Sequence, residues 1–208
     1  MKEFIIVQHC QSEQHVNGMV GSWTDWPLTE LGKRQANEIG VWLAERLPQE
    51  EPMDFVSSDL MRTAQTAQIV AGHMKLPVRY DKQLRELHYG DALGKSLQWY
   101  MEHKAPAESA ASPVDYKPFP NAESQREIYA RAEAFWASYL PTAGRWNIIS
   151  SHGAMVEALV FSFLRLGADA MAGGGIQGEA GGVTFLEENN GRRFMRAFAD
   201  STGYARAK

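Results

Sequence analysis

The stretch FIIVQHCQSE, residues 4–13, determines how the rest of the chain is interpreted. Four apolar residues, Phe4 to Val7, predict a short buried strand, and His9 follows at its C-terminal end. In open α/β sheets, ligands bind at that end of the strands. A second predicted strand, over residues 146–151, is also followed by a histidine, His152. If the two strands are parallel, both histidines lie at the same edge of the sheet.

Strand-like and helix-like segments alternate along most of the chain. Apolar runs at 53–58 and 76–81 predict two more strands, and a further pair of strand-like runs surrounds an Asn-Asn-Gly turn in 183–198. Helical spacing of apolar residues predicts helices at 30–47, 60–74, 95–104, 123–140 and 154–166. Thr29 and Asp59 are the predicted N-caps of the first two helices. This alternation predicts a three-layer α/β/α fold with a mostly parallel central sheet.

Length and composition indicate one ordinary globular domain spanning residues 1–208. Four prolines within 105–121 predict an irregular cap or insertion at about 95–121. The formal charge is -4 and like charges are not clustered, so we expect neither a nucleic-acid partner nor a membrane surface. The single cysteine excludes an internal disulfide, which is typical of a cytoplasmic protein. The sequence does not indicate an oligomeric state.

Four residues with suitable chemistry are expected at the histidine-bearing edge: His9, His152, Arg62 in the first turn of the 60–74 helix, and Glu86 after the third strand. Together they supply what phosphoryl transfer needs, namely a nucleophile, cations for the phosphate oxygens and an acid for the leaving oxygen. Taken singly, each has an ordinary structural interpretation, such as a satisfied strand-end histidine or a solvated surface charge. We find no Walker-type loop and no metal-ligand spacing, so no cofactor and no metal are expected.

Several segments, in order, carry a family pattern. Residues 8–12 read Gln-His-Cys-Gln-Ser where the pattern has Arg-His-Gly-Glu-Ser/Thr, and His15 takes the place of an Asn. The other matching segments are GSWTDWPLTELGKRQA (21–36), SSDLMRTAQTA (57–67), LRELHYGD, NAES (121–124) and SSHGAM. The chain therefore resembles the histidine phosphatase superfamily, the phosphoglycerate-mutase-like enzymes, from residue 4 to about 166.

The resemblance implies a phosphoglycerate mutase-like fold and a phosphatase of the histidine acid phosphatase type acting on a small-molecule phosphate ester. His9 would form a phosphohistidine that water hydrolyses, Arg62 and His152 would bind the phosphate oxygens and offset their charge, and Glu86 would act as acid and then base. The positions that it implies for phosphate binding are Gln8, Ser12, His15, Gly21, Ser22, Arg62 and Gly153.

The departures from the pattern leave alternatives open. Gln8 offers a neutral amide where the family has a charged arginine fork, so a catalytically weak or dead phosphate-binding module is one alternative. His15 could supply the missing charge if protonated, or be an ordinary loop histidine. A phosphoglycerate-type mutase is a second alternative, although residues 112–124 contain only Lys117 as a cation. Residues 13–28 and 95–121 are expected to form the rim and lid that select a small, modestly charged ester.

Overall fold

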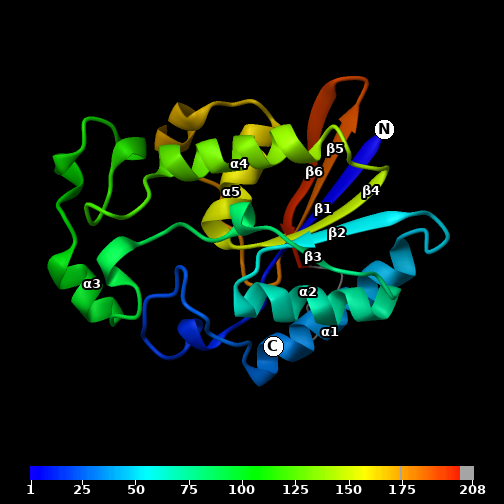
Figure 1. Ribbon diagram of the computed structural model, residues 1–208, viewed down its shortest axis with the longest axis horizontal. Helices are drawn as coiled ribbons and strands as arrows, with labels where there is room; N and C mark the ends of the chain where they lie inside the picture. Colours follow the sequence, from blue (N-terminus) through cyan, green and yellow to red (C-terminus); the bar gives the residue numbers. More distant parts are fainter. Residues whose placement is uncertain (174, 202–208) are drawn as a thin grey trace.

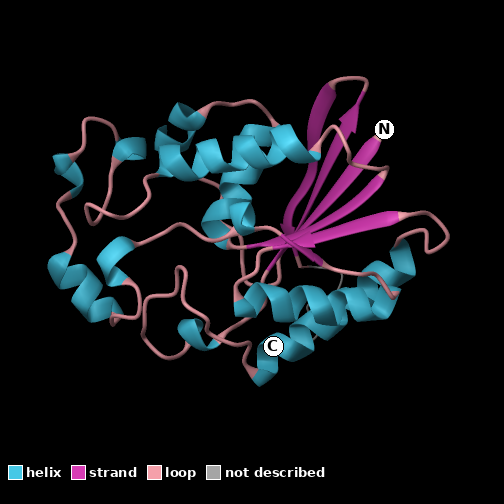
Figure 2. Cartoon of the chain, in the orientation of Figure 1, coloured by secondary structure: helices cyan, strands magenta, loops and turns pink. Residues whose placement is uncertain are grey.

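The computed structural model describes residues 1–173 and 175–201, which form a six-stranded mixed sheet between two layers of helices (Figures 1 and 2). The strand order is β3-β2-β4-β1-β5-β6. The strands are β1 (Lys2–Gln8), β2 (Met53–Ser57), β3 (Arg79–Tyr80), β4 (Trp146–Ser151), β5 (Val183–Asn189) and β6 (Arg192–Asp200). The pairs β3–β2, β2–β4 and β4–β1 are parallel, whereas β5 and β6 add to β1 as an antiparallel hairpin. The predicted α/β fold with a mostly parallel core is confirmed.

The helices cover both faces of the sheet, as Figure 1 shows. On one face lie α1 (Glu30–Arg46) and α2 (Met61–Met74), and on the other lie α4 (Gln125–Tyr139) and α5 (Gly153–Phe163). Successive residues of a strand point to opposite faces, so Phe4 packs in the core under α4 and α5 while Ile5 packs under α1 and α2. Coverage of both faces explains why β1 is continuously apolar instead of alternating. None of the described helices has the length and apolar character needed to cross a membrane.

Two local predictions were wrong. The third strand, expected over 76–81, is only Arg79–Tyr80, because Pro77 cannot donate to a ladder. Asp59 does not cap α2, whose N-cap residue is Leu60. Its carboxylate instead accepts hydrogen bonds of 2.6 Å from both Nε and Nη2 of Arg85. Thr29 does cap α1 as predicted, since its Oγ1 accepts from the Gly32 N–H at 3.0 Å.

The segment 95–121 is mostly irregular and lies at the far side of the molecule from the β5–β6 hairpin (Figure 1). It contains the short helix α3 (Leu97–His103) and two single 3-10 turns at Ala107–Ser109 and Pro113–Asp115. Aromatic packing anchors it to the rest of the chain, because Tyr100 packs against Tyr89 with ring centres 5.6 Å apart.

The loop that follows His9 packs against the first turn of α1 at Gly32. A Cβ on Gly32 would lie 1.9 Å from the backbone oxygen of Gln11, so backbone would have to move. We therefore expect Gly32→Ala to lower the free energy of unfolding by about 1–3 kcal/mol, although alanine is the better helix former. The matched control is Gly72→Ala in α2, where nothing lies within 4 Å of the new Cβ and stabilisation of about 0.4–1 kcal/mol is expected. Denaturant unfolding measures both, and equal stabilisation by the two substitutions would refute the close approach.

Candidate active site

His9 follows β1 directly, and its ring is 2% exposed. The backbone N–H of His9 donates to Ser151 O at 2.9 Å, which places it beside the end of β4. Its Nδ1 lies 2.8 Å from Cys10 O, and a carbonyl oxygen can only accept, so the proton is on Nδ1 and the lone pair is on Nε2. Burial, followed by the charge of Arg62, holds the pKa of His9 well below its ordinary value. His9 is therefore a neutral imidazole whose Nε2 carries the lone pair.

Arg62 brings a buried positive charge to this nitrogen. It is the second residue of α2 and is fully buried. Its Nε donates to His9 Nε2 at 3.1 Å, while Nη1 and Nη2 donate to the carbonyl oxygens of Thr24 and Ser22 at 2.9 and 2.8 Å. Burial lowers the pKa of Arg62 to about 10, so the guanidinium stays charged at neutral pH. The geometry provides a fixed cation for an anion that approaches Nε2.

His152 is the counterpart of His9 at the end of β4. The two rings meet edge-on with centres 5.1 Å apart, and His152 is completely buried. Its Nε2 lies 2.8 Å from Ser58 Oγ. Burial, then the charge of Arg62, holds the pKa of His152 well below its ordinary value, so the ring is neutral. The charge that the sequence analysis divided between Arg62 and His152 thus resides on Arg62.

Glu86 sits on a loop that is fixed from several sides. Its Oε1 accepts from the backbone N–H groups of Leu87 and Ala154, at 2.9 and 3.2 Å, which ties the carboxyl to the first turn of α5. Its carbonyl oxygen accepts from Trp23 Nε1 at 2.6 Å and from Arg131 Nη2 at 3.0 Å. Burial raises the pKa of Glu86. A carboxyl that retains its proton to a higher pH than usual is suited to donate one.

Three of the residues that the resemblance implied for phosphate binding make hydrogen bonds within the protein that hold the loop after β1. Ser22 Oγ donates to Leu87 O at 2.7 Å, and the Ser22 carbonyl is occupied by Arg62. The carbonyl of Gly21 accepts from Thr24. The N–H of Ser12 donates to His15 Nδ1 at 2.9 Å. Their contact with a phosphate stays a prediction.

His15 stacks on His9, with ring centres 5.4 Å apart and an interplanar angle of 22°. Because its Nδ1 accepts from Ser12, its proton is on Nε2. Desolvation against its neighbours and the charge of Arg62 lower the pKa of His15. The ring is therefore a neutral N–H donor and not a ready replacement for the family arginine.

Gln8 and Cys10 flank His9 and differ in the chemistry of their side chains. Gln8 ends β1 and is 9% exposed, and its Oε1 has no hydrogen-bond partner among the described residues. A Cβ built on Gly153, the first residue of α5, would lie 3.5 Å from Gln8 Nε2. Cys10 is buried, and its pKa is raised to about 12, so its thiol is an inert core group.

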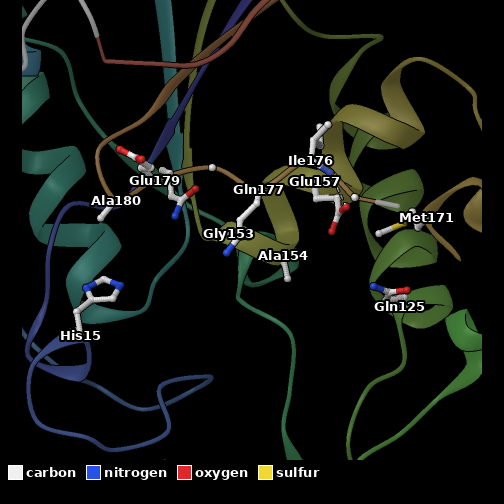
Figure 3. Close-up of a pocket in the computed structure, with 13 residues that line it drawn as sticks. His15, Gln125, Gly153, Ala154, Glu157, Met171, Ile176, Gln177, Glu179 and Ala180 are labelled. Carbon is white, nitrogen blue, oxygen red and sulfur yellow. Dashed lines mark hydrogen bonds between the residues drawn. The ribbon is translucent and has the colours of Figure 1, made fainter. Parts of the chain in front are cut away.

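A cavity of about 690 Å³ opens beside these groups (Figure 3). Gln8, His15 and Gly153 form one part of its wall, and Glu157 and residues 175–180 form another. Of the segments expected to form the rim and lid, 13–28 and 95–121, only His15 belongs to this wall. An adjoining cavity of about 350 Å³ is lined by Tyr100 and Tyr116 of the segment 95–121. It shares Gln125 and Met171 with the 690 Å³ cavity.

The main wall, which is built from the glycine-rich stretch before β5 and from Glu157 on an apolar helix, was not identified from the sequence. Its composition carries no signal for a binding wall; the wall arises from how β5 joins the sheet beside α5. Within residues 1–173 and 175–201, no group of three or more His, Cys, Asp or Glu side chains could hold a metal ion.

Comparison with known proteins identifies the family. The family model described as the histidine phosphatase superfamily (branch 1) matches residues 4–201. The chain belongs to the histidine phosphatase superfamily. Among its relatives is a glucosyl-3-phosphoglycerate phosphatase of Mycobacterium tuberculosis, 29% identical over 175 residues that cover 79% of this chain and 76% of the relative. A Yersinia pestis protein named "Probable phosphoglycerate mutase GpmB" is 30% identical, with 82% of this chain and 78% of the relative covered.

Solved structures agree with this membership of the histidine phosphatase superfamily. A mycobacterial glucosyl-3-phosphoglycerate phosphatase complexed with VO3 superposes with a TM-score of 0.82 and 26% identity, covering 97% of this chain and all (100%) of that one. The alpha-ribazole phosphatase of Shigella flexneri gives a TM-score of 0.79 at 21% identity, covers 95% of this chain and 96% of that chain, and supports the fold. The predicted superfamily and fold are confirmed, and the relatives support a phosphatase.

Proposed function

We propose that this protein is a cofactor-independent phosphomonoester phosphatase that acts through a phosphohistidine on His9. The observation that carries the proposal is the neutral Nε2 of His9 held 3.1 Å from the buried, charged guanidinium of Arg62. A lone pair and a cation at one point suit an attack on a phosphorus atom whose oxygens are negative. The proposal agrees with the phosphatases among the relatives.

In the first step, His9 Nε2 attacks phosphorus while the bond from phosphorus to the alcohol oxygen breaks. Arg62 binds the oxygens and offsets their charge, His152 contributes a ring N–H, and the Glu86 carboxyl gives its proton to the departing oxygen. In the second step, the Glu86 carboxylate takes a proton from water, the water oxygen attacks phosphorus, and the bond to Nε2 breaks. The hydrogen bond from Nδ1 to Cys10 O keeps the ring oriented throughout.

The second candidate is a module that binds a phosphorylated ligand without turning it over, and Gln8 is the observation that favours it. Incubation with a panel of phosphomonoesters, with His9→Ala as the control, decides between the two. We expect phosphate release by the native chain on several esters. No release above the control on any ester would leave the binding function alone.

The Gln8 amide tests whether the site is a weakened form of the family site. Because Gln8 Nε2 lies beside Gly153, an arginine at this position would direct its guanidinium toward the same place as the amide. A charge-assisted hydrogen bond contributes about 1.5–3 kcal/mol against about 0.5–1.5 for a neutral one. We therefore expect Gln8→Arg to raise kcat/KM for an aryl phosphate roughly tenfold. Steady-state kinetics with p-nitrophenyl phosphate measures the effect.

His15→Asn is the companion variant. Because the ring of His15 is a neutral donor, we expect this change to alter kcat/KM by less than about threefold, a difference well under 1.4 kcal/mol. If both single substitutions lower activity and the double mutant recovers it, His15 has taken over the role of the arginine. If none of the three variants changes activity, neither side chain touches the phosphate.

A further inference from the structure

We infer that the alcohol released from the substrate carries hydrogen-bond donors and no negative charge, and that Glu157 selects for it. The inference rests on the proposed phosphatase function and adds to it the chemical class of the leaving group. It follows from the wall of the 690 Å³ cavity beside His9, together with one unsatisfied buried amide.

The cavity wall is built of acceptors and neutral groups. Figure 3 shows Glu157 of α5 and Gln125 of α4 on one part of the wall, with Glu179 on the segment that leads to β5. No lysine or arginine belongs to the described lining, whose two charged side chains are the carboxylates of Glu157 and Glu179. The positive charge of the site, Arg62, lies behind the wall at the nucleophile. A ligand that extends from the phosphate into this cavity therefore leaves the cation and meets negative charge.

Glu157 is placed to contact the group next to the phosphate. It lies four residues after Gly153 on α5, so the two share a face of the helix, about one turn or 5.4 Å apart. Its Oε1 accepts from the Ile176 N–H at 3.1 Å, which fixes the carboxylate against the wall. Burial raises the pKa of Glu157, and a hydroxyl or ammonium donor from a ligand would relieve that cost.

The Gln8 amide gives an independent indication. The side chain is 9% exposed, lines the cavity, and leaves Oε1 without a donor among the described residues. That oxygen faces Gly178, since a Cβ there would lie 2.5 Å from it, whereas Nε2 faces Gly153. Buried acceptors in native proteins are nearly always paired. The oxygen is thus a buried acceptor that lacks a donor among the described residues, on a residue of the cavity wall.

A carboxylate on the leaving group would be repelled by the carboxylates of this wall. Two like charges about 6 Å apart, at the effective dielectric typical near a protein surface, disfavour binding by more than tenfold. The described lining of the wall offers such a carboxylate no cationic partner. Esters of hydroxy acids are therefore expected to bind more weakly than esters of polyols or amino alcohols with the same skeleton.

Two pairs of esters that differ by a carboxylate provide the test. Glycerol 3-phosphate is compared with 3-phosphoglycerate, and phosphoethanolamine with phosphoserine, each as a competitive inhibitor of p-nitrophenyl phosphate hydrolysis at constant ionic strength. We expect the inhibition constant of the carboxylate-free member to be lower by at least about tenfold in each pair, a difference of about 1.4 kcal/mol. Glu157→Gln should reduce this ratio to within about threefold of unity, and Glu50→Gln, at the opposite end of β2, should leave it unchanged.

The outcomes separate this inference from the function on which it rests. No hydrolysis of p-nitrophenyl phosphate would overturn the phosphatase proposal and this inference with it. Hydrolysis with equal inhibition within each pair, with tighter binding of the carboxylate esters, or with no binding of any of the four would overturn only the inference. If the folded Glu157→Gln variant keeps the preference for the carboxylate-free esters, another group makes the selection, and the role inferred for Glu157 is wrong. The ratio in the native protein remains decisive if that variant does not fold.

Discussion

Replacement of His9 by alanine is expected to lower kcat for phosphomonoester hydrolysis by about 10⁴-fold or more, the scale of losing a catalytic nucleophile. In the proposed mechanism, His9 Nε2 is the atom that bonds to phosphorus, and the neighbouring His15 cannot replace it because its Nε2 is protonated and its Nδ1 accepts from Ser12. His152 is likewise held by Ser58. A phosphate-release assay measures the loss.

Covalent labelling makes the same prediction specific to mechanism. After brief exposure to an ester labelled in its phosphate and rapid denaturation, the native chain should carry label on His9, and His9→Ala should carry none. His103→Ala, in the exposed helix α3, is the matched control and should behave as the native chain. Retention of more than about a tenth of the native activity by His9→Ala, a loss below 1.4 kcal/mol, would show that water attacks the ester directly.

The edge that carries the site could be predicted from the sequence because its determinants are local. Each of β1 and β4 contains adjacent apolar residues that point to opposite faces, Phe4–Val7 in β1 and Ile148–Ile149 in β4, which indicates a strand covered on both faces, and each strand is followed by a histidine. Parallel pairing of β1 with β4 then brings His9 and His152 together. Arg62 follows from the same logic, since it starts the helix after the neighbouring strand β2.

What the sequence could not provide depends on burial and on contacts between distant segments. The neutral state of His152 arises from complete burial beside Arg62, which no sequence spacing encodes. Asp59 is a residue type that favours the N-cap position, but its carboxylate binds the guanidinium of Arg85, 26 residues away, instead of capping α2. The acceptor-lined wall formed by Glu157 and residues 175–180 exists because the chain passes back over α5 before entering β5. Substrate selection, which depends on that wall, is accordingly the least predictable part of the site.

Glu86→Gln is expected to lower kcat/KM for an alkyl phosphate by about 10²–10⁴-fold, the usual contribution of a general acid. An alkoxide is a poor leaving group and needs the Glu86 proton as the bond breaks. A p-nitrophenolate leaves without protonation, so kcat/KM for p-nitrophenyl phosphate should fall by less than about tenfold, or 1.4 kcal/mol. kcat/KM includes only the steps through the first irreversible bond cleavage. The later role of Glu86 as a base therefore does not affect the comparison of the alkyl and aryl esters. Glu108→Gln, on an exposed turn of the segment 95–121, is the matched control.

The pH dependence provides the second half of this test. The acid works in its protonated form, so kcat/KM for the alkyl ester should decline as pH rises through the raised pKa of Glu86. His9 must be neutral to attack. Because its pKa is held well below the ordinary histidine value, protonation of His9 limits activity only at pH values below that ordinary value. In Glu86→Gln the alkaline decline attributed to this carboxyl should disappear for the alkyl ester. A decline that persists in the variant, or equal losses on the alkyl and aryl esters, would show that Glu86 does not deliver the proton to the leaving oxygen.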